Sequence, residues 1–233
     1  MSGFPYQTSS LNEESTYEDW KNNLYLSVFF PLMSNSWPSD SEWDEDLWTI
    51  DWSNCTQERA RLWPYLRAHS SQKTLRFGPP QFQHPSWDIP NSWMLGSELL
   101  IIANDSAQIQ LPDEHRWFSY WTGEELSVVS NATETGYPIA IIPENSVIPV
   151  FKTPPNSVNS ELFEDADRFR TVRLFGSQGS FTEADGTTYV FTSTASELTE
   201  TQMETKEGQL ELEGLTLDIS GPKVRHYTVI HTP

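Results

Sequence analysis

The stretch from Ser92 to Phe151 decides the fold, and it reads SWMLGSELLIIANDSAQIQLPDEHRWFSYWTGEELSVVSNATETGYPIAIIPENSVIPVF. It consists of short apolar runs, each ended by Gly, Asn, Asp or Pro, a pattern typical of β-strands joined by turns. Leu99 to Ala103 is a continuous apolar run with β-branched members, and aromatic side chains crowd positions 117–121 before a Thr-Gly pair. The stretch therefore predicts buried strands followed by an aromatic-rich turn.

Composition predicts a globular chain whose core depends on large aromatic rings. Its 233 residues suffice for one large domain or two small ones, and they include 10 tryptophans. The hydrophobic fraction of 36% is low, so much of the buried area must come from the aromatic 13%. A single cysteine, Cys55, excludes an internal disulfide.

The net charge excludes several classes of partner. The chain has 14 Lys and Arg against 33 Asp and Glu, which gives −19. Such a surface repels phosphate backbones and anionic membranes, so we expect neither a nucleic-acid nor a membrane partner. The N-terminus has no apolar signal-peptide core, so a cytoplasmic location is the default expectation. The sequons at Asn54, Asn104 and Asn131 are then chance matches.

Periodicity predicts two helices before the central stretch. Apolar residues recur at three- and four-residue steps over 17–30, which is typical of an amphipathic helix. A second helix is expected over 56–69, with Trp63 facing inward and Pro64 kinking it. Between them, the acidic and Trp-rich segment 37–52 reads as a solvated loop rather than a cation site.

Strands are expected again after the central stretch. The acidic segment 152–167, rich in Pro, Asn and Ser, is the best candidate for a linker. Strands are predicted at 170–175, around 181, and at 187–192, 197–204, 209–212, 215–219 and 227–231. Glycine-containing turns separate several of these runs.

Three short motifs occur in order within the central stretch. They are Met94-Leu95-Gly96 before an apolar strand, Trp121-Thr122-Gly123 at a turn, and the edge strand that ends at Phe151. Together they resemble the start of the C-terminal β-domain of glycoside hydrolase family 31, the α-glucosidase and α-xylosidase group. Arg61 to Leu66 is similar to an R-x-L-x-P-Y-L helix of that family, and Phe181 to Tyr189 resembles the hairpin of its distal β-domain.

The resemblance implies a mainly β protein. It predicts one or more β-sandwich domains with two N-terminal helices left from a truncated (β/α)8 barrel. The expected division is 1–77 as the helical end of a barrel, 78–155 as a proximal β-domain and 156–233 as a distal β-domain. The two β-domains are expected to pack as one compact unit or two.

The resemblance also implies that ordinary glycosidase chemistry is missing. The match begins at the seventh barrel strand, whereas the two carboxylates of a retaining glycosidase belong to earlier strands. The family's sugar-contacting Asp and His correspond to Ser10 and Ser36, and a hydroxyl replaces neither group. The sequence therefore favours a protein without ordinary glycosidase activity.

We expect carbohydrate or small-molecule binding through an aromatic pocket between the N-terminal helices and the 117–121 turn. No spacing forms a catalytic triad or a metal set, so no metal or cofactor is expected, and catalytic residues are not identified. The ligand-binding candidates are Trp37, Trp43, Trp117, Tyr120, Trp121, His84, His115, Glu98 and Asp88.

Two other functions stay open. The chain could be a repurposed small-molecule enzyme, of the cyclase or isomerase type, that works by orienting its substrate in the pocket. It could also be an accessory subunit that completes a barrel from another chain, or a homo-oligomer that covers an open barrel edge. His69, His84, His115, Glu98 and Asp88 are the polar groups available to the enzyme hypothesis.

Overall fold

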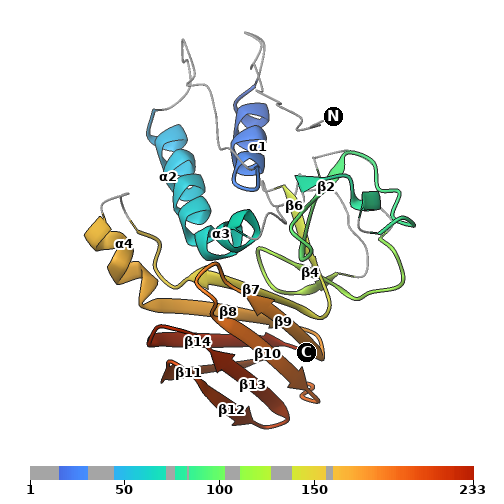
Figure 1. Ribbon diagram of the computed structural model, residues 1–233. Helices are drawn as coiled ribbons and strands as arrows, with labels where there is room; N and C mark the ends of the chain where they lie inside the picture. Colours follow the sequence, from blue (N-terminus) through green and yellow to red (C-terminus); the bar gives the residue numbers. More distant parts are fainter. Residues whose placement is uncertain are drawn as a thin grey trace.

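A computed structural model describes residues 16–30, 45–71, 77–82, 84–102, 111–126, 138–155 and 160–233. Within these residues, three helices lie beside a six-stranded sheet, and two four-stranded sheets form the lower part of the view in Figure 1. The mainly β class with N-terminal helices, predicted from the sequence, is confirmed.

Helix α1 (Tyr17–Ser27) matches the first predicted helix. It begins at a capping box, in which the Thr16 hydroxyl accepts from the Asp19 backbone amide and the Asp19 carboxylate accepts from the Thr16 amide, each at 3.2 Å. The predicted apolar face is buried, with Trp20 and Leu24 fully enclosed. This face fixes α1 against the rest of the core.

The second predicted helix is wrong in its bounds. Helix α2 (Glu45–Arg61) begins inside the segment expected to be a loop, and α3 (Trp63–Ser71) follows after Leu62. The acidic residues that suggested a loop include the first turn of α2, where carboxylates favour the positive end of the helix dipole. Pro64 lies in the first turn of α3, where a missing N–H costs nothing, so the chain breaks before it. Trp63 is 41% exposed rather than inward.

The central stretch supplies five of the six strands of an antiparallel sheet. Its strands are β1 (Phe77–Gly78), β2 (Ser92–Leu95), β3 (Leu99–Ile102), β4 (Trp117–Ser119), β5 (Glu125–Leu126) and β6 (Ile139–Pro143), in the order β1-β2-β3-β6-β4-β5. A single 3-10 turn, η1 (Pro80–Phe82), precedes β2. All four residues of β3 are buried, as expected for a continuous apolar strand. The turn after β4 carries the aromatic residues toward the helices.

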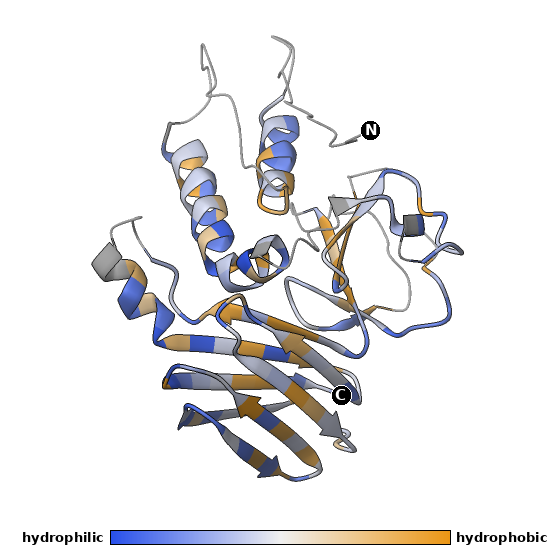
Figure 2. Ribbon diagram, viewed as in Figure 1, coloured by the Kyte–Doolittle hydropathy of each residue, from blue (hydrophilic) through white to orange (hydrophobic). Residues whose placement is uncertain are grey.

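The last third, together with β7 of the central stretch, forms a β-sandwich of two four-stranded sheets. One sheet has the order β11-β14-β8-β7, with β7 (Ser146–Phe151), β8 (Phe169–Phe175), β11 (Thr199–Thr205) and β14 (Arg225–Thr232). The other has the order β12-β13-β10-β9, with β9 (Gln178–Thr182), β10 (Thr188–Ser193), β12 (Gly208–Leu212) and β13 (Leu215–Ser220). Hydropathy alternates along these strands in Figure 2, and rings such as Tyr189 and Tyr227 meet between the sheets, 6.0 Å apart. The predicted strands are confirmed.

The predicted linker is partly helical. Helix α4 (Ser160–Asp167) occupies its second half and packs beside β8. Strand β7 pairs with β8 over six residues, from Ser146 with Phe175 to Phe151 with Arg170. Hydrogen bonds of one sheet therefore cross the boundary predicted near residue 155, and the division into 78–155 and 156–233 remains a prediction.

One continuous hydrophobic core joins the helices, the six-stranded sheet and the sandwich. A second cluster, built around Trp87 and Trp117, lies on the other face of the six-stranded sheet. In the parts of the chain that the structure describes, no helix is both long and apolar enough to cross a membrane. The arrangement places α1 and α2 over the turn that follows β4.

Candidate ligand-binding site

An open pocket of about 440 Å³ lies between α1, α2 and the turn after β4. Its aromatic wall consists of Tyr25 from α1 and Trp121 from the turn. Its polar wall comes from one face of α2, with Asn54 and Glu58 one turn apart and Gln57 and Arg61 beside them. This volume is within the range of about 300–1,000 Å³ that ligand sites occupy.

Trp121 is held in place from several sides. Its indole N–H donates to the Pro138 carbonyl oxygen at 2.8 Å. Its ring meets Tyr25, Phe29 and Tyr120 edge to face, at centroid distances of 6.3, 5.6 and 5.1 Å. These contacts fix the ring before any ligand arrives, which lowers the entropy lost on binding.

Glu58 is the carboxylate of the pocket, and two neighbours hold it. The buried Tyr120 hydroxyl donates to Glu58 Oε1, and Arg61 lies 3.7 Å from Glu58 Oε2. Burial and the charge of Glu58 raise the pKa of Tyr120 well above its ordinary value, so its hydroxyl remains a donor. Glu58 is thereby fixed as an acceptor on the pocket wall.

Positive charge surrounds this carboxylate. Lys152, just after β7, lines the pocket and is exposed. Behind Tyr120, the Arg173 guanidinium donates to the Tyr120 carbonyl oxygen at 2.6 Å. Burial lowers the pKa of Arg173, and the positive charge of Arg61 acts in the same direction. The pocket is therefore locally cationic in an otherwise strongly acidic chain.

Asp51 and Cys55 lie near the pocket but are occupied by the core. The Asp51 carboxylate accepts from the hydroxyls of Tyr17 and Tyr25, at 2.5 and 3.0 Å, and lies 3.6 Å from Lys21 Nζ. Burial, followed by the charge of Asp51, raises the pKa of the Cys55 thiol far above its usual range. A thiol in this state is a poor nucleophile.

Of the candidates predicted from the sequence, the pocket contains Trp121. Trp117 is buried in the second cluster and donates to the Pro112 carbonyl oxygen at 3.0 Å. Tyr120 is buried behind the pocket wall and acts through Glu58. Trp37, Trp43, Ser10 and Ser36 lie outside the described residues.

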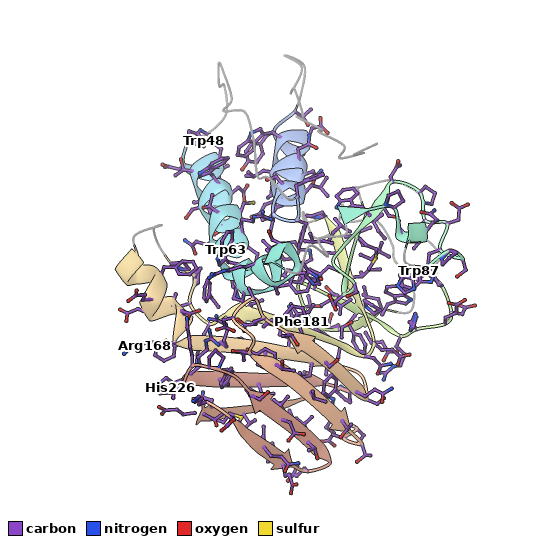
Figure 3. The ribbon with its side chains drawn as sticks, viewed as in Figure 1. Trp48, Trp63, Trp87, Arg168, Phe181 and His226 are labelled. Carbon is purple, nitrogen blue, oxygen red and sulfur yellow. The ribbon has the colours of Figure 1, made fainter. Side chains whose placement is uncertain are left out.

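The two candidate histidines belong to a separate aromatic cluster. His84 stacks on Trp87 at 3.6 Å between ring centroids, and His115 meets the same indole edge to face at 5.7 Å. Burial, followed by the charge of His115, lowers the pKa of His84. Trp87 lies well away from Trp48 and Trp63 of the helices (Figure 3). The histidines thus cover the second hydrophobic cluster rather than the pocket.

Glu98 and His69 are brought together, although not at a cavity. His69 Nε2 lies 3.2 Å from Glu98 Oε2, and the Tyr65 hydroxyl donates to the same oxygen at 2.8 Å. Burial alone would raise the pKa of Glu98, but His69, Ser97 and Tyr65 outweigh it and lower that pKa. The cluster joins α3 to the turn between β2 and β3. Asp88, by contrast, is exposed and accepts from Gln81 at 3.3 Å.

The polar wall of the pocket was not predicted. Asn54, Gln57, Glu58 and Arg61 follow the three- and four-residue spacing of one helix face, which is a signal visible in the sequence once α2 is recognised. Lys152 comes from a distant segment, and only the fold brings it to this place. Among the described residues, no group of three or more His, Cys, Asp or Glu could hold a metal ion.

Two other hollows suit a ligand less well. A larger one of about 590 Å³ at the ends of β10 and β13 is lined by Ser, Thr, Glu and Leu without an aromatic ring. A small cavity of about 60 Å³ between α3, α4 and the sandwich is filled by mutually paired charges, with Arg170, Asp167 and Arg225 at its centre. The pocket beside Trp121 combines an aromatic face with accessible polar groups.

The fold is that of the C-terminal part of glycoside hydrolase family 31 enzymes, as the sequence motifs predicted. No protein-family model and no curated protein matches the sequence. The similarity is to solved structures at 15–16% identity, and at this level it is a similarity of fold.

Three of these structures illustrate the match. A family 31 dextranase from Flavobacterium johnsoniae, solved with glucose, matches 82% of this chain and 28% of its own length with a TM-score of 0.58. The cycloalternan-forming enzyme from Listeria monocytogenes, with a pentasaccharide substrate, matches 90% and 27% with a TM-score of 0.54. A family 31 α-xylosidase from Xanthomonas citri matches 74% and 23% with a TM-score of 0.55. The chain thus spans about a quarter of the length of these enzymes.

Proposed function

We propose that this chain binds a saccharide or a similar small polar molecule in the pocket beside Trp121, without hydrolysing glycosidic bonds through a pair of carboxylates. The observation that carries the proposal is the pairing of a fixed indole ring with amide and charged groups of α2 in one pocket of about 440 Å³. An aromatic face that is flanked by planar polar groups suits a molecule with both apolar C–H faces and hydroxyls.

The number of carboxylates in the pocket also bears on whether it could hydrolyse a glycosidic bond. Retaining and inverting glycosidases both use two carboxyl groups, about 5 to 9.5 Å apart. Among the described residues that line this pocket, Glu58 is the only carboxylate, and the Tyr120 hydroxyl already donates to it. This arrangement supports binding rather than hydrolysis. The dextranase and the cycloalternan-forming enzyme, which share the fold, were solved with sugars, which favours the saccharide class.

The test is isothermal titration of the purified chain with glucose, xylose and isomaltotriose, alongside hydrolysis of aryl α-glucosides and α-xylosides. We expect binding without turnover, and a loss of at least tenfold in affinity for Trp121→Ala, equivalent to ~1.4 kcal/mol. Because that ring also packs against Tyr25 and Phe29, the double variant Asn54→Ala/Gln57→Ala, at two exposed positions, is the second probe.

The matched control is Gln209→Ala, which removes an exposed glutamine on β12 in the sandwich. Affinity that falls in the pocket variants and not in this control supports the proposal. Equal effects in all variants, or no binding of any tested sugar, would reject it. Hydrolysis well above background would reject the non-catalytic part.

A second candidate, a subunit that associates with another chain, is favoured by α2. Leu47 and Ile50 are three residues apart on this helix and are 53% and 55% exposed. Exposed apolar side chains on one helix face favour association. Light scattering of the chain at rising concentration tests this candidate: self-association that Leu47→Asp weakens would support a homo-oligomer, and a monomer at all concentrations would count against one.

A further inference from the structure

The charges around the pocket define the ligand more closely than its shape does. Among the described residues that line the pocket, the charged ones are Arg61, Lys152 and one carboxylate, Glu58, so their charges sum to +1. The buried guanidinium of Arg173 lies behind Tyr120, where it donates to the Tyr120 carbonyl oxygen and does not line the pocket. The whole chain carries −19, so this local excess of positive charge runs against the average of the surface.

The hydrogen bonds of Arg61 and Glu58 also indicate that positive charge exceeds negative charge here. The Nε atom of Arg61 is buried and has no hydrogen-bond partner among the described residues. Its Nη1 atom lies 3.7 Å from Glu58 Oε2, longer than a good charge-assisted bond. Glu58 Oε1 already accepts a hydrogen bond from the Tyr120 hydroxyl. The single carboxylate therefore cannot satisfy both cations.

We propose that the ligand of this pocket is a sugar acid, a monosaccharide or short saccharide with one carboxylate that Arg61 and Lys152 bind. The inference rests on the proposed function, since it specifies the ligand of the same site. One carboxylate balances the one excess charge, whereas a phosphate group, at about −1.5 to −2, would exceed it. Guanidinium groups also match the planar geometry of a carboxylate.

The other walls suit the rest of such a molecule. The face of Trp121 packs against the C–H groups of a pyranose ring, and the side-chain amides of Asn54 and Gln57 can each donate to and accept from its hydroxyls. Gln57 already donates to the Ser53 hydroxyl at 3.1 Å, which orients its amide.

The experiment compares D-glucuronate with D-glucose, which differ in one carboxylate, by isothermal titration at low salt. We expect glucuronate to bind at least tenfold more tightly, and this preference to fall as salt screens the charges. Lys152→Met and Arg61→Met, which keep apolar stems, should each reduce the preference at least threefold. The control Arg67→Met removes an exposed cation of α3 that lies outside the pocket and should leave the preference intact.

Two further ligands make the result decisive. Acetate carries the charge without the sugar, and glucose 6-phosphate carries a larger charge. Acetate binding as tightly as glucuronate, or glucose 6-phosphate binding more tightly, would overturn the sugar-acid assignment. Glucose equal to glucuronate would overturn it too but leave the proposed function standing. No binding of any sugar would overturn both.

Discussion

Gly96 is a residue for which no side chain fits. Its φ of +68° lies in the left-handed region, and a Cβ at this position would clash with the Tyr65 hydroxyl and the His69 imidazole. We expect Gly96→Ala to lower the free energy of unfolding by about 3 kcal/mol, of which ~1–2 is backbone strain and the rest overpacking. Urea unfolding followed by circular dichroism measures the loss.

Gly186 supplies the matched control. It also has a positive φ, +89°, but nothing lies within 4 Å of the position of its Cβ. Gly186→Ala should therefore cost only the backbone strain, about 1–2 kcal/mol. Equal losses at the two glycines would contradict the close packing of Gly96 against α3.

Glu98, which contacts His69 and Tyr65, makes the stability of the fold depend on pH. Its folded-state pKa is lowered, because contacts with His69, Ser97 and Tyr65 outweigh the desolvation that would raise it. A carboxylate with a lowered pKa stabilises the fold above its unfolded pKa of ~4.3, and this contribution disappears as the pH falls through the folded value. Glu98→Gln should thus cost about 1–3 kcal/mol at neutral pH and progressively less in acid.

The measurement is the difference in unfolding free energy between the natural chain and Glu98→Gln, from pH 7 down to pH 3. Every other carboxylate titrates in both proteins, so the difference reports Glu98 together with its contacts to His69, Ser97 and Tyr65. A difference that stays constant over this pH range would show that ionised Glu98 does not stabilise the fold.

At the scale of elements, Asp167 joins the end of α4 to the sandwich. Its carboxylate lies 2.6 Å from Arg170 of β8 and Lys223, and 3.2 Å from Arg225 of β14. Burial would raise its pKa, but these three cations hold it well below its usual range. Asp167→Ala removes the negative charge beside two buried guanidinium groups. We therefore expect the free energy of unfolding to fall by about 3 kcal/mol or more, measured by thermal or urea unfolding.

Asp165 tests whether the loss at Asp167 comes from burial. It belongs to the same helix and faces Arg168 at 3.6 Å, but both side chains are about 70% exposed, and Arg168 lies at the edge of the molecule in Figure 3. Asp165→Ala should change stability by less than about 0.5 kcal/mol. Comparable losses in both variants would mean that the buried charges do not hold α4 in place.

Strands and the first helix could be predicted because their patterns are local. The seven strands of the last third alternate with glycine turns, and α1 has both an apolar face and a cap. The first half of α2 and the whole of α4 are not predicted because their acidic residues read as solvated segments, while tertiary contacts and the helix dipole stabilise them. Helix propensity read from the sequence does not include these tertiary contacts.

The candidate site was harder to predict than the fold. Trp121 is a candidate in the sequence because an aromatic turn is a local feature, and the structure places it at a hollow beside α1 and α2. Trp117, the first residue of β4, and Tyr120, which follows β4, are both buried. Which of several adjacent rings faces a cavity depends on the register of β4 against β6, and the sequence does not reveal that register.

At the scale of the whole molecule, the helices and the sandwich share one core. Tyr65 of α3 stacks on Phe181 of β9, with 5.5 Å between the ring centroids. The pairing of β7 with β8 carries a sheet across the predicted domain boundary. Elements that share a core and a sheet lose contacts together when one of them unfolds, which favours a single cooperative transition.

The distribution of tryptophan makes this cooperativity measurable. All ten tryptophans lie between positions 20 and 121, so the sandwich strands from 146 to 232 contain none. Tryptophan fluorescence therefore reports the helices and the six-stranded sheet, whereas pulsed amide hydrogen exchange of β8 to β14 reports the sandwich. We expect the two signals to give the same urea midpoint. Separate midpoints would instead mean that the helices and the six-stranded sheet unfold independently of the sandwich, despite the core that they share.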